Sequence, residues 1–169
     1  MNDHLSLIAV LGLSYLLLNQ SSAEGGFRGE QDGGKKNFRS PLFEITFKYP
    51  SNWVKNPDYE ERYEGPEGFF QVDNIESFGR PIDQVVQQEI NTPIRPYGTN
   101  PTVTSLELDG QPARLITPSE DQQKIFDREL ALIVQDKKPI AQGQEIYDYT
   151  IIWSDRANIQ NIIDTFRFI

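Results

Sequence analysis

The sequence predicts an α+β fold, in which a mainly antiparallel β-sheet is covered by two or more helices. Several segments alternate apolar and polar residues with period two, as strands with one buried face do. Short turns containing glycine or proline join neighbouring segments, as in antiparallel hairpins. Residues 82–90 and 159–166 instead repeat apolar side chains at helical spacing, so each of these helices has a face to bury against the sheet.

Residues 43–49 are the segment around which the predicted domain is organised. Their sequence, FEITFKY, alternates apolar and polar residues, and we expect it to be the first strand of the domain. Pro50 ends this strand because proline has no N–H to donate to a neighbouring strand. Trp53 follows after a two-residue turn, and we expect its indole to seal the end of the sheet.

Two hairpins are predicted from their turn residues. The first turn is residues 65–68, GPEG, which separates two segments rich in aromatic residues. The second turn is Asp109-Gly110, and this dipeptide is the strongest short-range signal for a two-residue hairpin. The strands that these turns join are expected at residues 62–64 with 68–77, and at residues 102–108 with 112–117.

The two helices are predicted from apolar residues at spacings of three and four. Pro81 provides a suitable first residue for the helix at 82–90, and the pattern ends before Pro93. The second helix is expected at 159–166, near the end of the sequence. Asp155 is placed to cap its N-terminus, because a carboxylate can accept hydrogen bonds from the free N–H groups there.

Two further strands are predicted between the second hairpin and the second helix. Residues 128–135, RELALIVQ, are apolar on both faces, which is typical of a central strand. Residues 144–153 are expected to form the other strand, with four large side chains on one face: Tyr147, Tyr149, Ile151 and Trp153. If no helix covers this face, it forms an exposed aromatic patch suited to docking.

Along the chain we predict a signal peptide at residues 1–23, a flexible linker at 24–40 and a single domain at 41–169. Residues 5–18 form an apolar run, shorter than the roughly 20 residues of a membrane span and suited to a secretory signal. Small residues near Ala23 suit cleavage. A buried N-terminal helix and an uncleaved membrane tether are the alternatives. The linker contains five glycines and almost no aliphatic residues, so it cannot bury enough apolar surface to fold.

Charge and composition exclude several kinds of chemistry. The formal net charge of −9 would repel a phosphate backbone, so we predict no nucleic-acid partner. The sequence has no cysteine, which excludes disulfides, thiolate nucleophiles and cysteine-ligated zinc. Its single histidine, His4, lies in the predicted signal peptide. The domain therefore lacks the usual general base near neutral pH, and we expect no catalytic residue, no metal ligand and no cofactor.

Two groups of polar residues are candidates for chemistry, and each has a simpler structural interpretation. Four acidic residues around the first hairpin could supply oxygen ligands to calcium: Asp58, Glu60, Glu64 and Glu67. They lack the spacing of a dedicated calcium loop, and a solvated acidic edge that opposes strand aggregation is the simpler interpretation. Ser119 lies near Lys124, but their spacing does not match that of a serine–lysine catalytic pair.

Residues 93–101, PIRPYGTNP, form the best candidate for a binding site. Three prolines and a glycine in nine residues predict a structured loop that is not helical. Arg95, Tyr97 and Asn100 are the predicted binding residues, because a preorganised loop with aromatic and arginine side chains loses little entropy on binding. In the alternative interpretation, Tyr97 packs on the sheet and Arg95 pairs with a carboxylate.

The order of these elements, with Tyr49, Pro50 and Trp53 at the end of the first predicted strand, resembles the Mog1/PsbP-like family. In that family the first strand runs into a YP-x-x-W turn, and an antiparallel sheet is sandwiched between helices. The resemblance covers about residues 41–169. Members include the extrinsic PsbP subunit of photosystem II, a binder of the Ran GTPase and bacterial envelope proteins. The metal-binding histidines of some PsbP members have no counterpart in residues 24–169.

Composition and resemblance together predict a non-catalytic binding or accessory domain that is secreted or held in the cell envelope. We expect it to dock on a protein or an envelope component, with membrane contact only through an uncleaved N-terminus. One alternative is a PsbP-like extrinsic photosystem II subunit or assembly factor. The other is a hydrolase that uses carboxylates alone, which requires two of them facing each other about 5–10 Å apart across a cleft.

Overall fold

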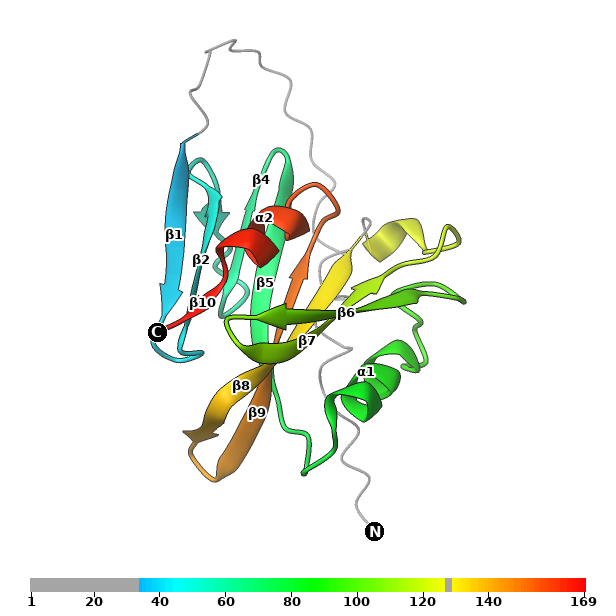
Figure 1. Ribbon diagram of the computed structural model, residues 1–169. Coiled ribbons are helices and arrows are strands. Elements are labelled where there is room, and N and C mark those ends of the chain that lie inside the picture. Colours follow the sequence, from blue (N-terminus) through cyan, green and yellow to red (C-terminus); the bar gives the residue numbers. More distant parts are fainter. Residues whose placement is uncertain (1–33, 127–128) are drawn as a thin grey trace.

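A computed structural model describes residues 34–126 and 129–169 of the chain. These residues form ten strands, two α-helices and one 3-10 helix, η3 (Lys124–Phe126), as Figure 1 shows. Every strand pair is antiparallel, so the predicted α+β fold with a mainly antiparallel sheet is confirmed. The predicted signal peptide at residues 1–23 lies outside the described residues. None of the described helices is long and apolar enough to cross a membrane.

The larger sheet has seven strands. Its central strand is β9, which lies between β5 and β8. Its spatial order is β3 (Val54–Lys55), β4 (Arg62–Gly65), β5 (Gly68–Ile75), β9 (Glu145–Ser154), β8 (Leu130–Gln142), β7 (Gln111–Thr117) and β6 (Thr102–Leu108). Because β9 pairs on both sides, the last long strand of the sequence joins the two halves of the sheet.

The smaller sheet has three strands from distant parts of the chain. Its central strand is β2 (Ile45–Pro50), which pairs with β1 (Lys35–Ser40) on one side and β10 (Arg167–Phe168) on the other. The pairing places Ser40 and Phe168 beside Ile45. The C-terminal strand therefore completes a sheet that the first described strand begins.

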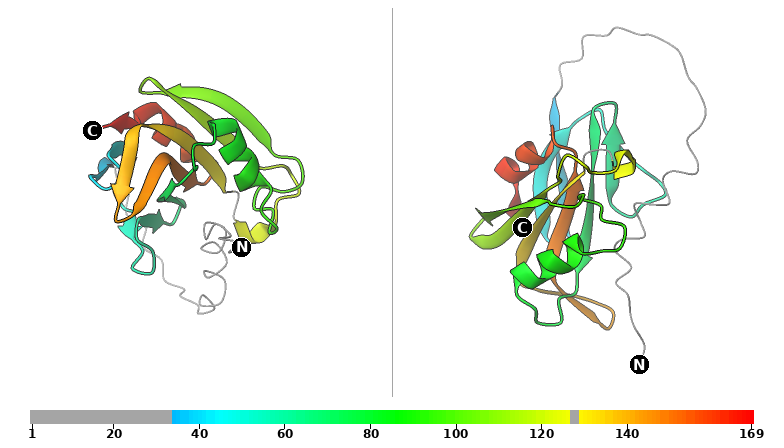
Figure 2. Two further views of the ribbon diagram at one scale, coloured as in Figure 1. Left: turned by 90° about the horizontal axis from the view of Figure 1, so that it is seen from below. Right: turned by 90° about the vertical axis from the view of Figure 1, so that its right-hand side faces the viewer.

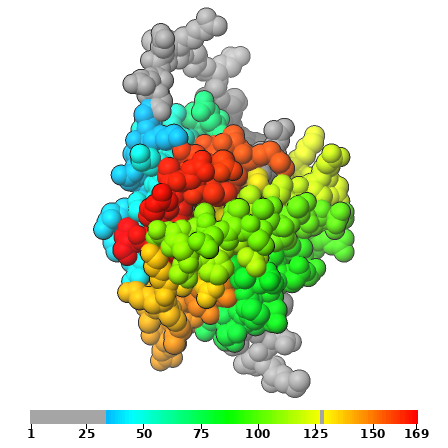
Figure 3. Space-filling model, in the orientation of Figure 1, coloured from blue at the N-terminus to red at the C-terminus, as the bar shows by residue number. Residues whose placement is uncertain are grey.

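The two helices cover opposite faces of the seven-stranded sheet, as the views in Figures 1 and 2 show. Helix α1 (Ile82–Ile90) packs its buried side chains with residues such as Ile133 and Ile151. Helix α2 (Ile159–Thr165) and the three-stranded sheet enclose the core on the other face. In the space-filling view, α2 lies beside the surface formed by β6 and β7 (Figure 3).

The local turn and helix predictions are confirmed. Leu108 pairs with Gln111, so Asp109 and Gly110 form a two-residue hairpin loop with φ angles of 50° and 82°. Left-handed backbone at both positions is what such a hairpin requires. Gly65 pairs with Gly68 across the first turn. Both helices lie within the predicted ranges, and they begin and end within a residue of the expected positions.

The capping prediction for the second helix is wrong in position, because the N-cap residue of α2 is Asn158 and no side-chain hydrogen bond caps that helix. Asp155 Oδ1 accepts from the backbone N–H groups of Ala157 at 2.9 Å and Asn158 at 3.2 Å, in the turn before α2 begins. Its other oxygen accepts from the backbone N–H of Phe69 at 3.1 Å. The carboxylate therefore orders the start of α2 and also fixes it against strand β5.

Two boundary predictions are wrong. Residues 35–40, assigned to the flexible linker, form strand β1, so the predicted first strand is the second of the chain. Phe38 supplies the reason, because its ring is buried and lies 4.8 Å from the ring of Phe47. Strand β8 also continues to Gln142, through a break in register between Gln135 and Ile140. The remainder of the linker, residues 24–33, lies outside the described residues.

The aromatic face predicted on residues 144–153 is not an exposed patch. Tyr149, Ile151 and Trp153 are buried in the core beneath α1, and Tyr147 is half-buried. Because the helix covers this face, the structure excludes it as the docking surface considered above.

Trp53 seals the edge of the core, as the sequence predicts. Its side chain is fully buried (0% exposed), and its ring stacks on that of Phe70 with 6.2 Å between ring centroids. Gly65 lies against the indole so closely that a Cβ atom there would stand 2.3 Å from Trp53 Cδ1. A real side chain does not fit at that distance, so Gly65 is required by the packing of Trp53.

We expect Gly65→Ala to destabilise the protein by roughly 1–3 kcal/mol, because the added methyl group must displace a buried indole. Chemical denaturation followed by tryptophan fluorescence measures this change. The exposed neighbour Glu67→Ala is the control and should change stability by less than about 0.5 kcal/mol. Equal stability of the Gly65→Ala variant and the wild type would contradict the packing described here.

Candidate functional site

The loop predicted as a binding site follows directly on helix α1 and is built from two successive turns. The N–H of Arg95 donates to the carbonyl of Thr92 at 3.0 Å, and the N–H of Gly98 donates to the carbonyl of Arg95 at 3.1 Å. Arg95 has a φ of 46°, a left-handed conformation that is unfavourable for arginine. Strain of this kind persists only where the surroundings determine the backbone, and it occurs often at functional sites.

Residues 119–122 hold the loop in place. The backbone N–H of Ser119 donates to the carbonyl of Tyr97 at 3.0 Å, and the Gln122 side chain donates to the carbonyl of Pro96 at 2.9 Å. The Thr99 hydroxyl donates to Asp121 Oδ2 at 2.6 Å. Hydrogen bonds from Ser119 and then from Thr99 lower the pKa of Asp121 to about 2, so this carboxylate is charged at neutral pH. Hydrogen bonds with Ser119, Asp121 and Gln122 therefore hold the loop at several points, and we call these three residues the clip.

Ser119 has a structural role in this clip. Its hydroxyl oxygen accepts from the backbone N–H of Asn100 at 3.2 Å, and the hydroxyl also makes a short contact with Asp121 Oδ1. Lys124 begins the 3-10 helix η3, and no hydrogen bond joins it to Ser119 in the part of the chain that the structure describes. The arrangement does not resemble a serine–lysine catalytic pair.

Tyr97 lies in the core and not on the surface of the loop. Its side chain is fully buried (0% exposed). The hydroxyl donates to Glu89 Oε1 at 2.8 Å and accepts from Trp153 Nε1 at 3.0 Å. Of the two interpretations of Tyr97, the structure supports packing on the sheet, and its predicted role as a contact residue is corrected accordingly.

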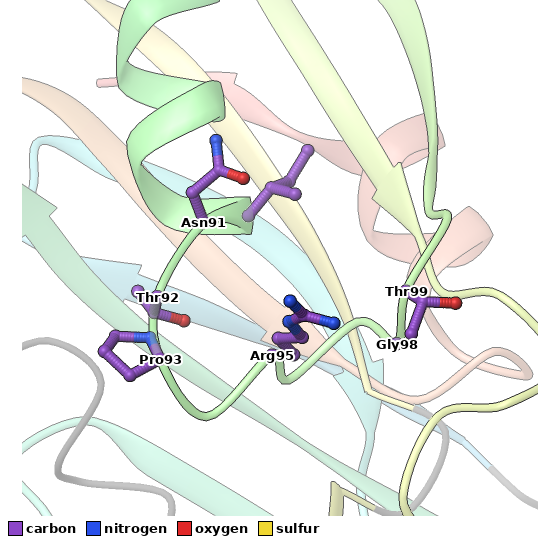
Figure 4. Close-up of a pocket in the computed structure, with 7 residues that line it drawn as sticks. Asn91, Thr92, Pro93, Arg95, Gly98 and Thr99 are labelled. Atoms are coloured by element: carbon purple, nitrogen blue, oxygen red, sulfur yellow. The ribbon is translucent and has the colours of Figure 1, made fainter.

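Arg95 is exposed, and its guanidinium points into a pocket between the end of α1 and the loop (Figure 4). The pocket has a volume of about 320 Å³. It is lined by the end of α1 and by the loop residues Thr92, Pro93, Arg95, Gly98 and Thr99. No ion pair joins Arg95 to a carboxylate within residues 34–126 and 129–169.

Asn100 is exposed but does not line this pocket. Its backbone N–H donates to the Ser119 hydroxyl at 3.2 Å. Of the three predicted binding residues, the structure therefore places Arg95 in a pocket, Asn100 on the nearby surface and Tyr97 beneath both. Thr92, which lines the pocket, was not among the predicted residues, because an isolated threonine in a loop carries no sequence signal.

Two carboxyl groups lie near Tyr97, of which Glu89 is buried and Glu129 half-buried. Burial raises the pKa of Glu89, and hydrogen bonds from Tyr97 and Trp153 oppose this rise. Burial also raises the pKa of Glu129 to about 8; the charge of Glu89 adds to this rise, and the charge of Arg62 opposes it. Burial shifts both groups toward the neutral form, and the charge of Glu89 makes ionisation of Glu129 less favourable.

A further buried carboxyl group, that of Asp136, lies in strand β8 at the start of the stretch between Gln135 and Ile140 where the register shifts. Burial raises the pKa of Asp136 to about 7, although the Thr150 hydroxyl donates to its Oδ1 at 2.8 Å and opposes the rise. Thr150 also lies 3.4 Å from Asn74 Oδ1. These three polar residues from neighbouring strands were not singled out in the sequence, because a period-two pattern does not show which polar residue faces the core.

The acidic residues around the first hairpin do not form a metal site. Glu64 Oε2 pairs with Arg62 Nε at 2.9 Å, and Glu64 Oε1 accepts from Asn56 at 2.8 Å. Glu67 is exposed on the turn. Among the described residues, no group of three or more acidic or histidine side chains is arranged to hold a metal ion.

The stability of the protein should fall as pH rises from about 5 to about 9. The pKa of Glu129 is raised from its ordinary value of 4.5 to about 8, so the folded state holds a proton that the unfolded state has lost. This contribution to stability is complete below the ordinary pKa and is lost as pH rises through the raised one. Glu89 and Asp136 act in the same direction, because their pKa values are also raised.

Glu129→Gln tests this pH dependence. We expect the variant to match the wild type at about pH 5 and to be more stable by on the order of 2 kcal/mol at about pH 9. Thermal denaturation across this pH range measures the difference. The exposed position Glu120→Gln is the control and should leave the pH profile unchanged. A wild-type profile that rises over this interval would show that the buried carboxyl groups are paired differently.

Removing the clip should loosen the loop without unfolding the domain. In the wild type, the Thr99 N–H donates to Asp121 Oδ1 at 3.2 Å. Asp121→Ala removes this acceptor, so we expect faster hydrogen exchange at Thr99. Amide exchange measured by NMR provides the readout. Glu120→Ala, which removes a neighbouring exposed carboxylate, should leave the exchange rate unchanged. Unaltered exchange in Asp121→Ala would mean that the loop is ordered without this residue.

Fold and site together define a class of protein: an antiparallel α+β domain with an open polar pocket on a clipped surface loop. Such an arrangement is suited to binding, because the groups that face solvent are already ordered.

Comparison with known proteins gives limited further information. No protein-family model matches the sequence, and no curated protein is significantly similar to it. The fold is similar to the solution structure of cyanobacterial PsbP (CyanoP) from Synechocystis sp. PCC 6803, with a TM-score of 0.45 and 12% identity. The alignment covers 86% of this chain and 98% of that one. Similarity at this level does not assign a family, so kinship with the Mog1/PsbP-like family stands as a proposal.

Proposed function

We propose that this protein is a non-catalytic binding or accessory domain that acts outside the cytoplasm and docks on a protein or envelope partner through the loop around Arg95. One observation carries the proposal. Arg95 is exposed on a loop clipped by Asp121 and Ser119, and its guanidinium points into a pocket without a carboxylate partner among the described residues.

The energetics of binding favour this loop as the contact. A loop that is ordered before binding loses little conformational entropy when a partner arrives. Arginine is enriched among the residues that contribute most to binding, because its guanidinium can form several hydrogen bonds in a fixed geometry. The left-handed backbone of Arg95 is a strained conformation that the clip maintains.

Location outside the cytoplasm is proposed from the sequence. The apolar run at residues 5–18 has the length of a secretory signal, and small residues follow it near Ala23. Kinship with the Mog1/PsbP-like family is proposed on the element order and on Tyr49, Pro50 and Trp53. In this chain Tyr49 and Trp53 are both buried where strand β2 ends at Pro50. Under that kinship, an extrinsic photosystem subunit is the alternative to an envelope protein, and the host decides between them.

The alternative of a carboxylate hydrolase has less support. The two carboxyl groups nearest to acting as a pair are Glu89 and Glu129, because the charge of Glu89 raises the pKa of Glu129. Glu89 is buried and hydrogen-bonded to Tyr97, and neither residue lines the pocket. A hydrolytic pair needs both groups to reach the substrate. This geometry favours a structural role for the two glutamates.

The proposal is tested by capture of partners from intact cell envelopes with the tagged full-length protein. We expect Arg95→Ala to reduce recovery of the specific partner several-fold, because it removes an exposed charged group from the pocket. Arg156→Ala is the matched control, since it removes the same charge at an exposed position before α2. Circular dichroism confirms that both variants fold. Equal recovery by Arg95→Ala and the wild type would rule out the loop as the contact, and cell fractionation tests the location separately.

A further inference from the structure

The pocket at the end of α1 combines one cation with a hydroxyl group that has no partner. The Thr92 Oγ1 atom is buried and has no hydrogen-bond partner among the described residues. Figure 4 shows this hydroxyl and the Arg95 guanidinium on the same side of the loop, both pointing into the pocket. The Thr99 side chain points away, because its hydroxyl donates to Asp121. The Arg95 guanidinium and the Thr92 hydroxyl can each donate a hydrogen bond to a ligand here, and the Asn91 side chain also lines the pocket.

A buried hydroxyl without a partner is costly, and so it points to a ligand that supplies an acceptor. Leaving such a group unsatisfied costs stability because it has lost its water. A guanidinium and a hydroxyl side by side match an oxyanion, whose two oxygens can each accept a hydrogen bond. The Asn91 amide nitrogen already donates to the carbonyl of Gln87 at 2.7 Å, so it does not compete for the oxyanion.

The charges around the pocket favour an oxyanion with a single negative charge. The pocket lies at the C-terminal end of α1, where the helix dipole places partial negative charge. Among the described residues, Arg95 is the one cation that lines the pocket. A single positive charge beside a helix C-terminus balances a singly charged group better than it balances a dianion such as phosphate. The volume of about 320 Å³ lies at the lower end of the range for ligand sites, so it suits a small group.

We propose that this pocket binds a single carboxylate group, with Arg95 pairing with the carboxylate and the Thr92 hydroxyl donating to one of its oxygens. This inference rests on the proposed function, because it names the chemistry that the same loop recognises. The carboxylate can belong to a small organic acid or to an acidic residue of a partner protein. The two sources share the same contacts and differ only in what surrounds the carboxylate.

The test is an NMR titration of the full-length protein that follows the backbone amides of residues 91–99. N-acetylglycine is the small-acid probe, and a peptide with blocked ends and one glutamate is the protein-type probe. N-acetylglycinamide, which lacks the charge, and inorganic phosphate are the comparisons. We expect saturable shifts with both carboxylate probes at millimolar concentration, weaker shifts with phosphate and none with the amide. Tighter binding of the peptide would identify a partner protein as the source, and equal binding would identify the small acid as sufficient.

Substitutions separate the contributions of the two side chains. We expect Arg95→Gln to weaken carboxylate binding at least about tenfold, and Thr92→Val, which keeps the shape of the side chain, to weaken it about threefold to tenfold. Arg156→Gln should leave the affinity unchanged. The inference is overturned if neither carboxylate gives saturable shifts, if the amide or phosphate binds as tightly, or if Arg95→Gln binds like the wild type.

The two proposals fail in distinguishable ways. If envelope capture depends on Arg95 but the titration shows no carboxylate binding, only the assigned ligand chemistry is wrong. If the titration succeeds and capture does not depend on Arg95, the pocket binds a carboxylate, but it is not the contact for the captured partner.

Discussion

The hydrogen bonds of the Tyr97 hydroxyl are the constraint on which the candidate site depends. This buried group donates to Glu89 in helix α1 and accepts from Trp153 in strand β9, so it fastens the loop to both the helix and the central part of the sheet. With Tyr97 anchored below, Arg95 is held above it in a left-handed conformation. A polar anchor in an apolar core is favourable only when its partners are satisfied, and here each partner comes from a different layer.

The same anchor explains why an acidic protein holds carboxyl groups with raised pKa values near Tyr97. The Tyr97 hydroxyl needs an acceptor within the core, and Glu89 provides it at the cost of being removed from water. Glu129 then lies close enough for its ionisation to be opposed by that of Glu89. Carboxyl groups with raised pKa values make the interior sensitive to alkaline pH, while the charged surface carries the net charge of −9.

The sequence predicted those parts of the fold that local physics determines. The Asp109-Gly110 hairpin was predictable because its φ angles suit few other residues, and the helices were predictable because their apolar periodicity is local. Strand β1 was missed because Phe38 becomes buried only by contact with Phe47. For Tyr97 the sequence left both a binding role and packing on the sheet open, because a loop sequence does not reveal which side chain faces the core. Arg95 was identified correctly as a residue of the loop surface, whereas Thr92 acquires its importance only from the geometry of the pocket.

The three-stranded sheet has a consequence for how the chain folds. Strand β2 lies near the beginning of the domain, yet one of its two neighbours is β10, formed by Arg167–Phe168. Until residues 167–168 pair with it, one edge of β2 lacks its native partner. Contacts so distant along the chain form slowly because a long loop must close first. The smaller sheet can therefore be completed only once strand β10 is available to pair with β2.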